Sequence, residues 1–436
     1  MQSGLTFEYS KSVGELNSTS ALDVLSLPRH RWYFVKEAFS PSLVSQAIKD
    51  SKCNENDLII DVFCGGGTVP VTAALEGYST IGFEVNPFLA FIAKTKLLQC
   101  NPKTIDRHLG IITDQARHGV ISSLEAYSTF TDPGKAKKWL FNKDVLRAFE
   151  GGWKATIGKD SVVRDLLRLC LIGAAMDVCN AVKDGKCLRY RADWEDRHFG
   201  KEDFICAFKK RASEVKQDLE RCPMTVANAD IRLIDSRKLN NKTFERKRFK
   251  LCVMSPPYLN SFDYTDIYRP ELFLGRFVRS QKDLQALRLR TLRSHVQVDW
   301  NDPKQLNFGP LFTDSFTEIK KHTDILWNKR IPSMIQAYFE DIKRVLVNLR
   351  RSAQEDASVW IVVSTSAYVG VEIPVDLIIA DIGSQTGWLM RELKVMHYLR
   401  RVPGQQWNKL YKRKNKRPHL RESIIILDAK PKVEMK

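Results

Sequence analysis

The chain has 436 residues, of which 43% are hydrophobic, and it carries a formal net charge of +18 at neutral pH. This length allows one large domain with insertions or two domains. The basic excess predicts a polyanionic partner such as a nucleic acid. The most apolar helical stretch, residues 162–179, is interrupted by Arg164, Asp165, Arg168 and Asp177, so we expect no membrane span and no membrane partner.

Nine cysteines are scattered along the chain without a CxxC pair or a Cys/His grouping of zinc spacing. An odd number of such thiols is typical of a reducing compartment. The first 17 residues lack a basic start followed by an apolar stretch, so no export signal is expected. We therefore expect a cytoplasmic protein without a metal site.

The first strong motif is an apolar strand that runs into a glycine-rich loop and then a helix. It reads Leu58-Ile59-Ile60-Asp61-Val62-Phe63-Cys64-Gly65-Gly66-Gly67-Thr68. Glycines let a backbone approach a ligand closely, and the amides at a helix start face that ligand. The spacing is neither the dinucleotide fingerprint nor a phosphate loop, because no Gly-Lys-Ser/Thr follows. The loop predicts a nucleotide-type site that does not favour a phosphate.

Glu84 ends a second strand about sixteen residues after the loop. In Rossmann folds, an acid that binds ribose follows the glycine turn in a similar way. We expect Glu84 to hold ribose hydroxyls and Asn86 to open the next helix. The alternative is a solvated carboxylate at a strand end, which the preceding glycine loop disfavours. Cys64 is interpreted as a small packing residue rather than a nucleophile, because enzymes that attack the cytosine ring place their cysteine after a proline in another loop.

Residues 101–220 depart from the strand–helix alternation that precedes them and are predicted to be helical and polar-faced. Trp139-Leu140-Phe141 and Trp153 are expected to anchor a small core of their own. The same region holds the turn Lys183-Asp184-Gly185-Lys186, which leads into Leu188-Arg189-Tyr190-Arg191, where basic and aromatic residues alternate. This stretch either follows a phosphate backbone or forms an exposed basic strand that packs its tyrosine on the main domain.

The most specific stretch is Ser255-Pro256-Pro257-Tyr258, which follows the apolar strand 251–254. The exocyclic amine of a base is a poor nucleophile, because its lone pair is delocalised into the ring. The Ser255 hydroxyl and the Pro256 carbonyl are two acceptors for its two protons and would localise that pair. Consecutive prolines stiffen the turn, and the Tyr258 ring can stack on a base rotated out of its helix. The alternative is an ordinary proline turn with a buried tyrosine.

The rest of the chain adds elements and basic stretches. Residues 263–272 are predicted to begin a helix beside the turn, and 338–350 an amphipathic helix that leads into a central strand at 359–363. Residues 288–295 are basic and either contact DNA or form a solvated helix face. Lys and Arg crowd 409–417, a predicted basic finger that could touch DNA.

With both motifs present, the chain resembles an S-adenosylmethionine-dependent amino-methyltransferase of DNA, of the N4-cytosine and N6-adenine group. The resemblance implies an α/β fold, a Rossmann-like methyltransferase sheet with a large helical insertion. Residues 30–41 resemble the segment that closes over the methionine part of the cofactor, and 420–427 resemble the last core strand. Asp235-Ser236-Arg237 resembles the acidic motif that contacts the cofactor's adenine, with Asp230 as a competitor.

The resemblance assigns roles residue by residue. The residues implied for catalysis are Ser255, Pro256, Pro257 and Tyr258. The residues implied for binding S-adenosyl-L-methionine are Phe39, Pro41, Asp61, Phe63, Cys64, Gly65, Gly67, Thr68, Glu84, Asn86 and Asp235. The implied partner is double-stranded DNA, and a cognate restriction endonuclease acting separately is compatible with it.

Serine in the first catalytic position is commoner among relatives that act on cytosine N4, so this target is favoured over adenine N6. An RNA base-amine methyltransferase and a catalytically silent DNA-binding regulator are the alternatives. The long insertion separates Glu84 from Asp235. The segment that recognises the target sequence is therefore expected either before or after the catalytic turn. The expected organisation is core with cofactor loop (1–100), helical insertion (101–220), core with catalytic motif (221–275), candidate target-recognition segment (276–335) and C-terminal core (336–436).

Overall fold

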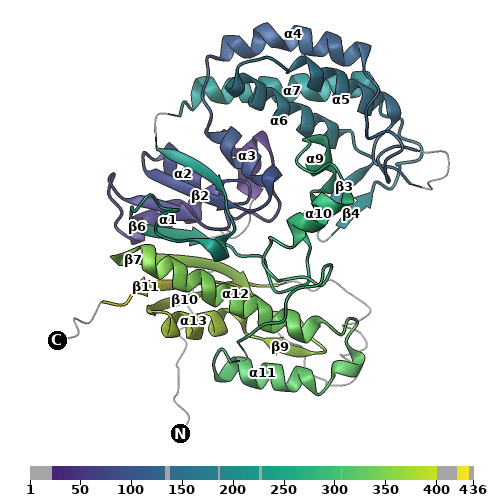
Figure 1. Ribbon diagram of the computed structural model, residues 1–436. Helices are drawn as coiled ribbons and strands as arrows, with labels where there is room; N and C mark the ends of the chain where they lie inside the picture. Colours follow the sequence, from purple (N-terminus) through teal and green to yellow (C-terminus); the bar gives the residue numbers. More distant parts are fainter. Residues whose placement is uncertain are drawn as a thin grey trace.

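The computed structural model describes residues 22–132, 138–184, 187–224, 228–305, 307–399 and 420–431. A seven-stranded sheet of order β10-β11-β7-β6-β1-β2-β5 forms its centre (Figure 1). Strands β5, β2, β1, β6 and β7 run parallel, and β11 runs antiparallel to both of its neighbours. The strands are β1 (Leu58–Asp61), β2 (Ser79–Glu84), β5 (Ala229–Leu233), β6 (Phe249–Met254), β7 (Ala353–Ser364), β10 (Trp388–Tyr398) and β11 (Arg421–Ala429). The predicted α/β architecture with a mainly parallel sheet is confirmed.

Helices cover both faces of the sheet, and the alternation of side chains along β6 explains how. Leu251 and Val253 pack with α1 and α2, whereas Cys252 and Met254 pack with α12. Successive side chains of a strand point to opposite faces, so a strand buried on both sides is apolar throughout. The covering helices are α1 (Pro41–Asp50), α2 (Thr68–Leu75), α12 (Ile331–Ser352) and α13 (Val375–Gln385). The predicted helix at 338–350 and strand at 359–363 lie inside α12 and β7.

A helical layer lies above the sheet and is built from the region after residue 100 (Figure 1). Leu140, Phe141 and Trp153 are buried in it, but their cluster also contains Tyr33 and Phe88. The expectation of a separate small core is therefore wrong, because the helices share one continuous core with α3 and the segment before the glycine loop. The elements of this layer are α4 (Pro102–His118), α5 (Lys143–Ala155), α6 (Ser161–Asp177), α7 (Lys201–Arg221) and the hairpin β3 (Ala181–Asp184) with β4 (Cys187–Tyr190).

Shorter elements complete the fold. The predicted helix after the Ser255–Tyr258 turn is confirmed as two short helices, α8 and α9. In Figure 1, α11 and β9 lie on the side of the sheet away from the helical layer. The remaining elements are α3 (Pro87–Leu97), α8 (Tyr264–Ile267), α9 (Arg269–Leu274), α10 (Gln281–Arg288), α11 (Pro310–Lys320), β8 (Ser366–Tyr368), β9 (Val371–Ile373) and the 3-10 turns η1 (Leu22–Leu25), η2 (His30–Trp32), η3 (Ser236–Lys238) and η4 (Thr323–Ile325).

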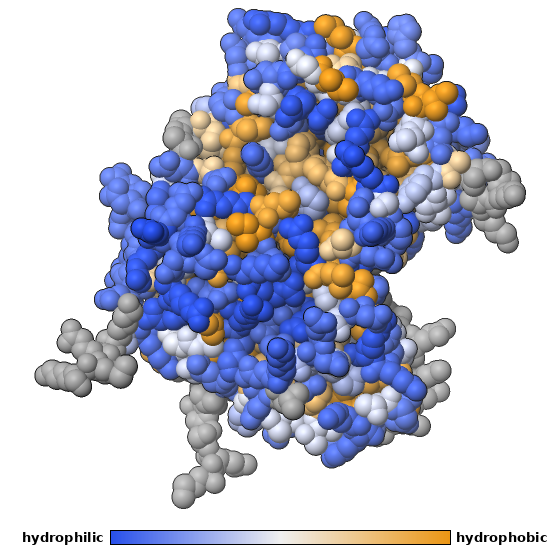
Figure 2. Space-filling view, in the orientation of Figure 1, coloured by the Kyte–Doolittle hydropathy of each residue, from blue (hydrophilic) through white to orange (hydrophobic). Residues whose placement is uncertain are grey.

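The surface in this orientation is mostly hydrophilic, with apolar side chains gathered in its middle between the helical layer and the lower half (Figure 2). Within the described ranges, no helix is both long and apolar enough to cross a bilayer. The nine cysteines all lie in those ranges and are free thiols. The predicted basic finger at 409–417 lies outside the described residues.

Candidate active site

A cavity of about 400 Å³ opens at the carboxyl ends of the parallel strands. The chain segments that leave β1, β2, β5 and β6 all border it, which is where α/β sheets place their ligands. It joins the glycine loop to the Ser-Pro-Pro-Tyr turn. Of the predicted site residues, those that line it are Phe39, Asp61, Phe63, Cys64, Gly65, Thr68, Glu84, Asn86, Asp235, Ser255, Pro256, Pro257 and Tyr258.

Two predicted cofactor residues do not line the cavity. Pro41 starts α1 and is buried there, behind the capping residue Ser40. Gly67 turns the chain into α2 with a φ of 88°, and a Cβ there would lie 2.9 Å from the Cα of Ala93. Neither residue borders the cavity, so their predicted contact with a cofactor stays a prediction without support from this geometry.

The glycine loop is wedged between α3 and the segment before α1. A Cβ on Gly66 would lie 2.6 Å from Cγ2 of Val35, so no larger residue fits without displacing that segment. Lys96 of α3 is buried below the loop, and its Nζ donates to the carbonyl oxygens of Tyr33 (3.0 Å) and Gly66 (3.1 Å). Burial lowers the pKa of Lys96 to about 7. One ammonium group therefore ties the loop to the segment that covers it.

Cys64 belongs to the loop, but its sulfur packs against the second strand. A Cβ on Gly82 would lie 2.6 Å from Sγ of Cys64, and the sulfur shares an apolar cluster with Ala90, Ala93 and Ile231. Burial raises the pKa of the thiol well above its ordinary value. A buried, protonated thiol is a packing group and not a nucleophile.

Three polar groups of the loop region face the cavity. Glu84 is buried and accepts backbone hydrogen bonds from Gly65 (2.7 Å) on Oε2 and from Val85 (2.9 Å) and Asn86 (2.8 Å) on Oε1. Burial nevertheless raises its pKa, and burial also raises the pKa of Asp61 well above its ordinary value. Asn86 caps α3 through Oδ1, while its Nδ2 is buried without a hydrogen-bond partner among the described residues. The cavity thus contains an unused amide donor beside an acidic wall.

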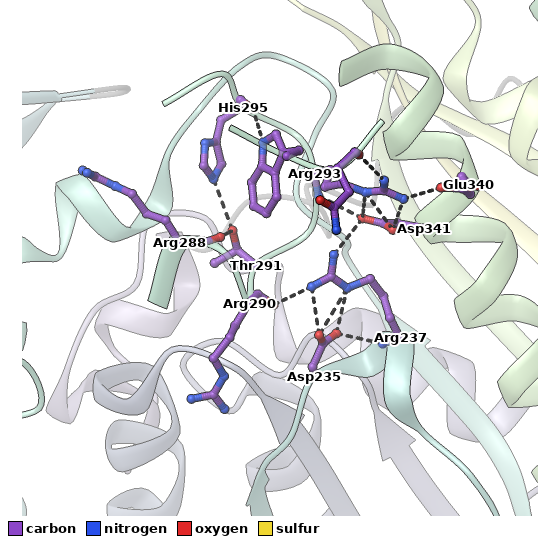
Figure 3. Close-up of polar contacts among 11 residues, drawn as sticks. Asp235, Arg237, Arg288, Arg290, Thr291, Arg293, His295, Glu340 and Asp341 are labelled. Carbon is purple, nitrogen blue, oxygen red and sulfur yellow. Dashed lines mark hydrogen bonds and ion pairs between the residues drawn. The ribbon is translucent and has the colours of Figure 1, made fainter. Parts of the chain in front are cut away.

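Asp235 forms another part of the wall and is held by Arg237 (Figure 3). Asp230, the competing acid, is half-exposed, is paired with Arg232 and does not line the cavity. Of the two acids, Asp235 and not Asp230 borders the cavity.

The catalytic turn presents acceptors to the cavity. Ser255 Oγ donates to the carbonyl oxygen of Val362 in β7 at 3.2 Å, which leaves its lone pairs for a ligand. Within the described ranges, no hydrogen bond reaches the carbonyl oxygen of Pro256. Tyr258 is anchored by its hydroxyl, which donates to Oε1 of Glu422 at 2.6 Å, and burial beside this carboxylate raises its pKa well above 10.

Several lining residues were not predicted from the sequence. Glu37 accepts a 2.7 Å hydrogen bond from the hydroxyl of Tyr268, and His295 and Glu422 come from segments far along the chain. Segments 30–41, 288–295 and 420–427 stood out in the sequence, but no local pattern singles out these three side chains, because only the tertiary fold brings them to the cavity. Counted together, the lining side chains include five carboxylates (Glu37, Asp61, Glu84, Asp235, Glu422) and three cations (Lys36, Arg237, Arg290). In a chain of net charge +18, this acidic cavity suits a positively charged ligand.

The basic stretch 288–295 is mostly engaged inside the protein (Figure 3). Arg288 pairs with Asp263 at 2.6 Å, and Arg293 pairs with Asp341 at 2.7 Å. His295 is buried, and its Nε2 lies 3.2 Å from the hydroxyl of Thr291. Both the phosphate-contact interpretation and the solvated-face interpretation are therefore wrong for these three side chains.

The basic hairpin of the helical layer is likewise engaged in internal contacts. Lys183 pairs with the buried Glu271, and its Nζ lies 3.8 Å from the ring centroid of Tyr268. Arg191 donates to the carbonyl oxygen of Cys179 at 2.9 Å, and Tyr190 packs against Trp194. Tyr190 therefore packs, but within the helical layer and not on the main domain as that interpretation had it. In the described part of the chain, no three His, Cys, Asp or Glu side chains are grouped as metal ligands.

Comparisons with known proteins point to methyltransferases. No family model matches the chain. The type II methyltransferase M.BsoBI of Geobacillus stearothermophilus is 26% identical over 448 residues, which covers 91% of this chain and 85% of that protein. The type II methyltransferase M.AvaI of Nostoc sp. (strain PCC 7120) is 24% identical over 414 residues, covering 85% and 81%. Among solved structures, the rRNA methyltransferase aviRa of Streptomyces viridochromogenes aligns over 97% of this chain and 96% of its own, with 9% identity and a TM-score of 0.33.

Proposed function

We propose that this chain is a site-specific DNA methyltransferase that transfers a methyl group from S-adenosyl-L-methionine to the exocyclic amine of a flipped base, with N4 of cytosine as the target. The observation that carries the proposal is one cavity bordered by both the glycine loop and the Ser255–Tyr258 turn. The similarity to two type II methyltransferases over most of their length supports site-specific methylation of DNA.

The residues of the loop half fit the cofactor. S-adenosyl-L-methionine supplies a methyl group that is already activated by a positively charged sulfur. The acidic lining suits that charge, and Glu84 Oε2, with a single backbone donor, has room to accept from a ribose hydroxyl. The unused Nδ2 of Asn86 is a donor for a ligand oxygen, and Asp235 is the acceptor assigned to the adenine. Val35 to Phe39 line this half of the cavity, as expected of a segment that closes over the methionine part of the cofactor.

The turn half polarises the target amine. Ser255 Oγ borders the cavity next to the Pro256 carbonyl, hydrogen-bonds to Val362 and Tyr258, and keeps a lone pair with which it can accept from a ligand. Two acceptors that bind the two amine protons turn the nitrogen toward tetrahedral geometry and direct its lone pair at the methyl group. The Tyr258 ring, fixed through its hydroxyl, offers a flat apolar face for the flipped base. The protein supplies orientation and polarisation, and no metal enters the proposed reaction.

Serine at the first position of the turn favours cytosine N4 in this proposal. A carboxylate there would be the stronger acceptor, and both bases present the same amine geometry, so adenine N6 is the alternative. The relatives' type II designation supports a role in a restriction–modification system, with an endonuclease of the same recognition site as a separate protein.

The test is to express the chain in a host without this modification, digest the DNA and identify the modified nucleoside by mass spectrometry. N4-methylcytosine is expected, at one sequence context in single-molecule reads. N6-methyladenine would move the target to the other base. Transfer of labelled methyl groups to total RNA but not to duplex DNA would contradict the proposal, and the Ser255→Ala variant is the matched control.

A further inference from the structure

Glu422 lies at the start of β11, beside the catalytic turn. It is 8% exposed and lines the cavity, and its Oε1 accepts the 2.6 Å hydrogen bond from Tyr258. Burial and this carboxylate together raise the pKa of the phenol, so Tyr258 stays a donor and Glu422 the acceptor. The neighbouring Arg421 pairs with Asp376 instead, at 2.8 Å, as expected for adjacent strand residues that point to opposite faces.

The other carboxylate oxygen of Glu422, Oε2, faces the neighbouring strand β10. Glu422 and His397 are cross-strand partners in the β10–β11 ladder, and Oε2 lies 3.7 Å from Nε2 of His397. The side chain of His397 is 50% exposed. Among the described residues, the groups that face Glu422 include Tyr258 from the turn after β6 and His397 from β10, with Ser364 of β7 as its partner in the other ladder. A carboxylate at the cavity is linked in this way to a titratable group at the surface.

The proposed reaction leaves a proton to be removed. As the amine nitrogen forms its bond to the methyl carbon, the bond from carbon to sulfur breaks and sulfur keeps the electron pair. The nitrogen then carries one proton too many and a positive charge. The Ser255 hydroxyl and the Pro256 carbonyl accept hydrogen bonds, but neither group is basic enough to keep a proton at neutral pH. A carboxylate can accept this proton as the nitrogen becomes neutral and then release it to a neighbouring group.

We propose that Glu422 is a catalytic residue that takes this proton from the methylated amine, and that His397 passes it to solvent. The inference rests on the proposed function and deepens it. Glu422 changes from carboxylate to carboxylic acid as the nitrogen becomes neutral. Transfer of that proton to His397 and then to water restores the carboxylate, so charge and atoms balance over one turnover.

A purely structural role for Glu422, which would be to hold the Tyr258 ring, makes different predictions. Glu422→Gln keeps an oxygen that accepts from the Tyr258 hydroxyl but removes the basic group. If Glu422 only positions Tyr258, this variant should transfer methyl groups at nearly the wild-type rate. If Glu422 accepts the proton, its single-turnover rate should fall about 100-fold, the usual scale for loss of a general base.

The experiment measures single-turnover transfer of labelled methyl groups to genomic DNA from a host that lacks the modification, between about pH 5 and about pH 8. The wild-type rate should fall on acidification, because a general base acts only in its deprotonated form. Glu422→Gln should be slow and nearly independent of pH in this range, and Glu422→Asp should partly restore both the rate and its pH dependence. His397→Asn should be slowed less and should regain rate with added imidazole. Cofactor affinity, measured by calorimetry, should be unchanged in each variant.

Each outcome decides a separate point. A wild-type rate in Glu422→Gln, or a slow rate that keeps the wild-type pH profile, overturns the proton-accepting role while the proposed function stands. A wild-type chain that transfers no methyl group to DNA overturns the proposed function, and this inference with it. A Glu422→Gln variant that loses cofactor binding as well as rate overturns the assignment of Glu422 to the proton step.

Discussion

Arg237 holds the carboxylate of Asp235 with two nitrogens, and its own guanidinium is held by Asp341 of α12 at 3.1 Å (Figure 3). Nη2 of Arg237 also donates to the carbonyl oxygen of Arg290 at 3.0 Å. Arg293, in the same segment as Arg290, shares Asp341 at 2.7 Å. The acid assigned to the cofactor's adenine is thus braced by the same buried ion pairs that fix the segment bordering the cavity.

Removal of Asp341 should destabilise the protein strongly. Its carboxylate is buried and pairs with two guanidinium groups, each of which keeps one other partner, Asp235 for Arg237 and Glu340 for Arg293, so the cost should be near the lower end of the range of about 3–5 kcal/mol for breaking a buried ion pair. We expect Asp341→Ala to lower the free energy of unfolding by that amount in urea titrations. Asp299→Asn is the control, because Asp299 pairs with Arg330 at the surface, where ion pairs contribute at most about 1 kcal/mol. Equal effects of the two substitutions would contradict the bracing role.

Ser255→Ala should separate binding from turnover. The hydroxyl touches no residue of the cofactor loop, so affinity for S-adenosyl-L-methionine in calorimetry should be unchanged. Loss of one acceptor that acts in the transition state should lower turnover by about 100-fold or more. Ser315→Ala, on the exposed surface of α11, is the control and should keep full activity. Unchanged turnover in Ser255→Ala would remove this residue from the mechanism.

The sequence predicted those parts of the candidate site that are formed by consecutive residues. A glycine loop after a strand and a diproline turn after another strand are readable from adjacent residues, and their meeting follows from the rule that parallel strands end at one edge. Glu422 was not predictable as a site residue, because its contact with Tyr258 spans 164 residues and depends on the sheet order β6-β7-β11. Arg288 and Arg293 were misread for the same reason, since their partners Asp263 and Asp341 are placed by the tertiary fold.

Arg290 is the cation of the 288–295 stretch that should contact DNA. Its side chain is exposed at the cavity, has no ion-pair partner among the described residues and points away from the ion-pair network (Figure 3). We expect Arg290→Gln to weaken binding of duplex DNA in fluorescence anisotropy titrations. The slope of log affinity against log salt concentration should fall by about one, as for loss of one phosphate contact.

The control for this prediction is Arg351→Gln. Arg351 is also exposed, but it lies just before the amino-terminal end of β7. The cavity lies at the other end of the strands. Substitution of Arg351 should leave the salt slope unchanged. Equal slopes in the two variants would show that Arg290 does not contact the phosphate backbone.

Gly66→Ala should impair cofactor binding. The added methyl group would lie 2.6 Å from Cγ2 of Val35 and would push the covering segment away from the loop. Overpacking of this kind costs about 1–3 kcal/mol, which corresponds to an affinity loss of roughly 10-fold or more if it falls on the bound form. Gly110→Ala is the matched control, because a Cβ there meets no atom within 4 Å. Equal cofactor affinity of the two variants in calorimetry would contradict the close fit of the loop.

Lys96 should make stability depend on pH in the alkaline range. In the unfolded chain its amine keeps a proton up to its ordinary pKa of 10.5, whereas burial lowers its pKa to about 7 in the folded protein. Between these values the unfolded state binds more protons, so the contribution of Lys96 to stability rises with pH, by up to about 1.4 kcal/mol per unit. Lys96→Met removes the titrating group and should flatten that rise. Urea titrations at several pH values between about 7 and about 10 measure it. A difference between wild type and variant that stays constant with pH would mean that the folded protein does not shift this amine.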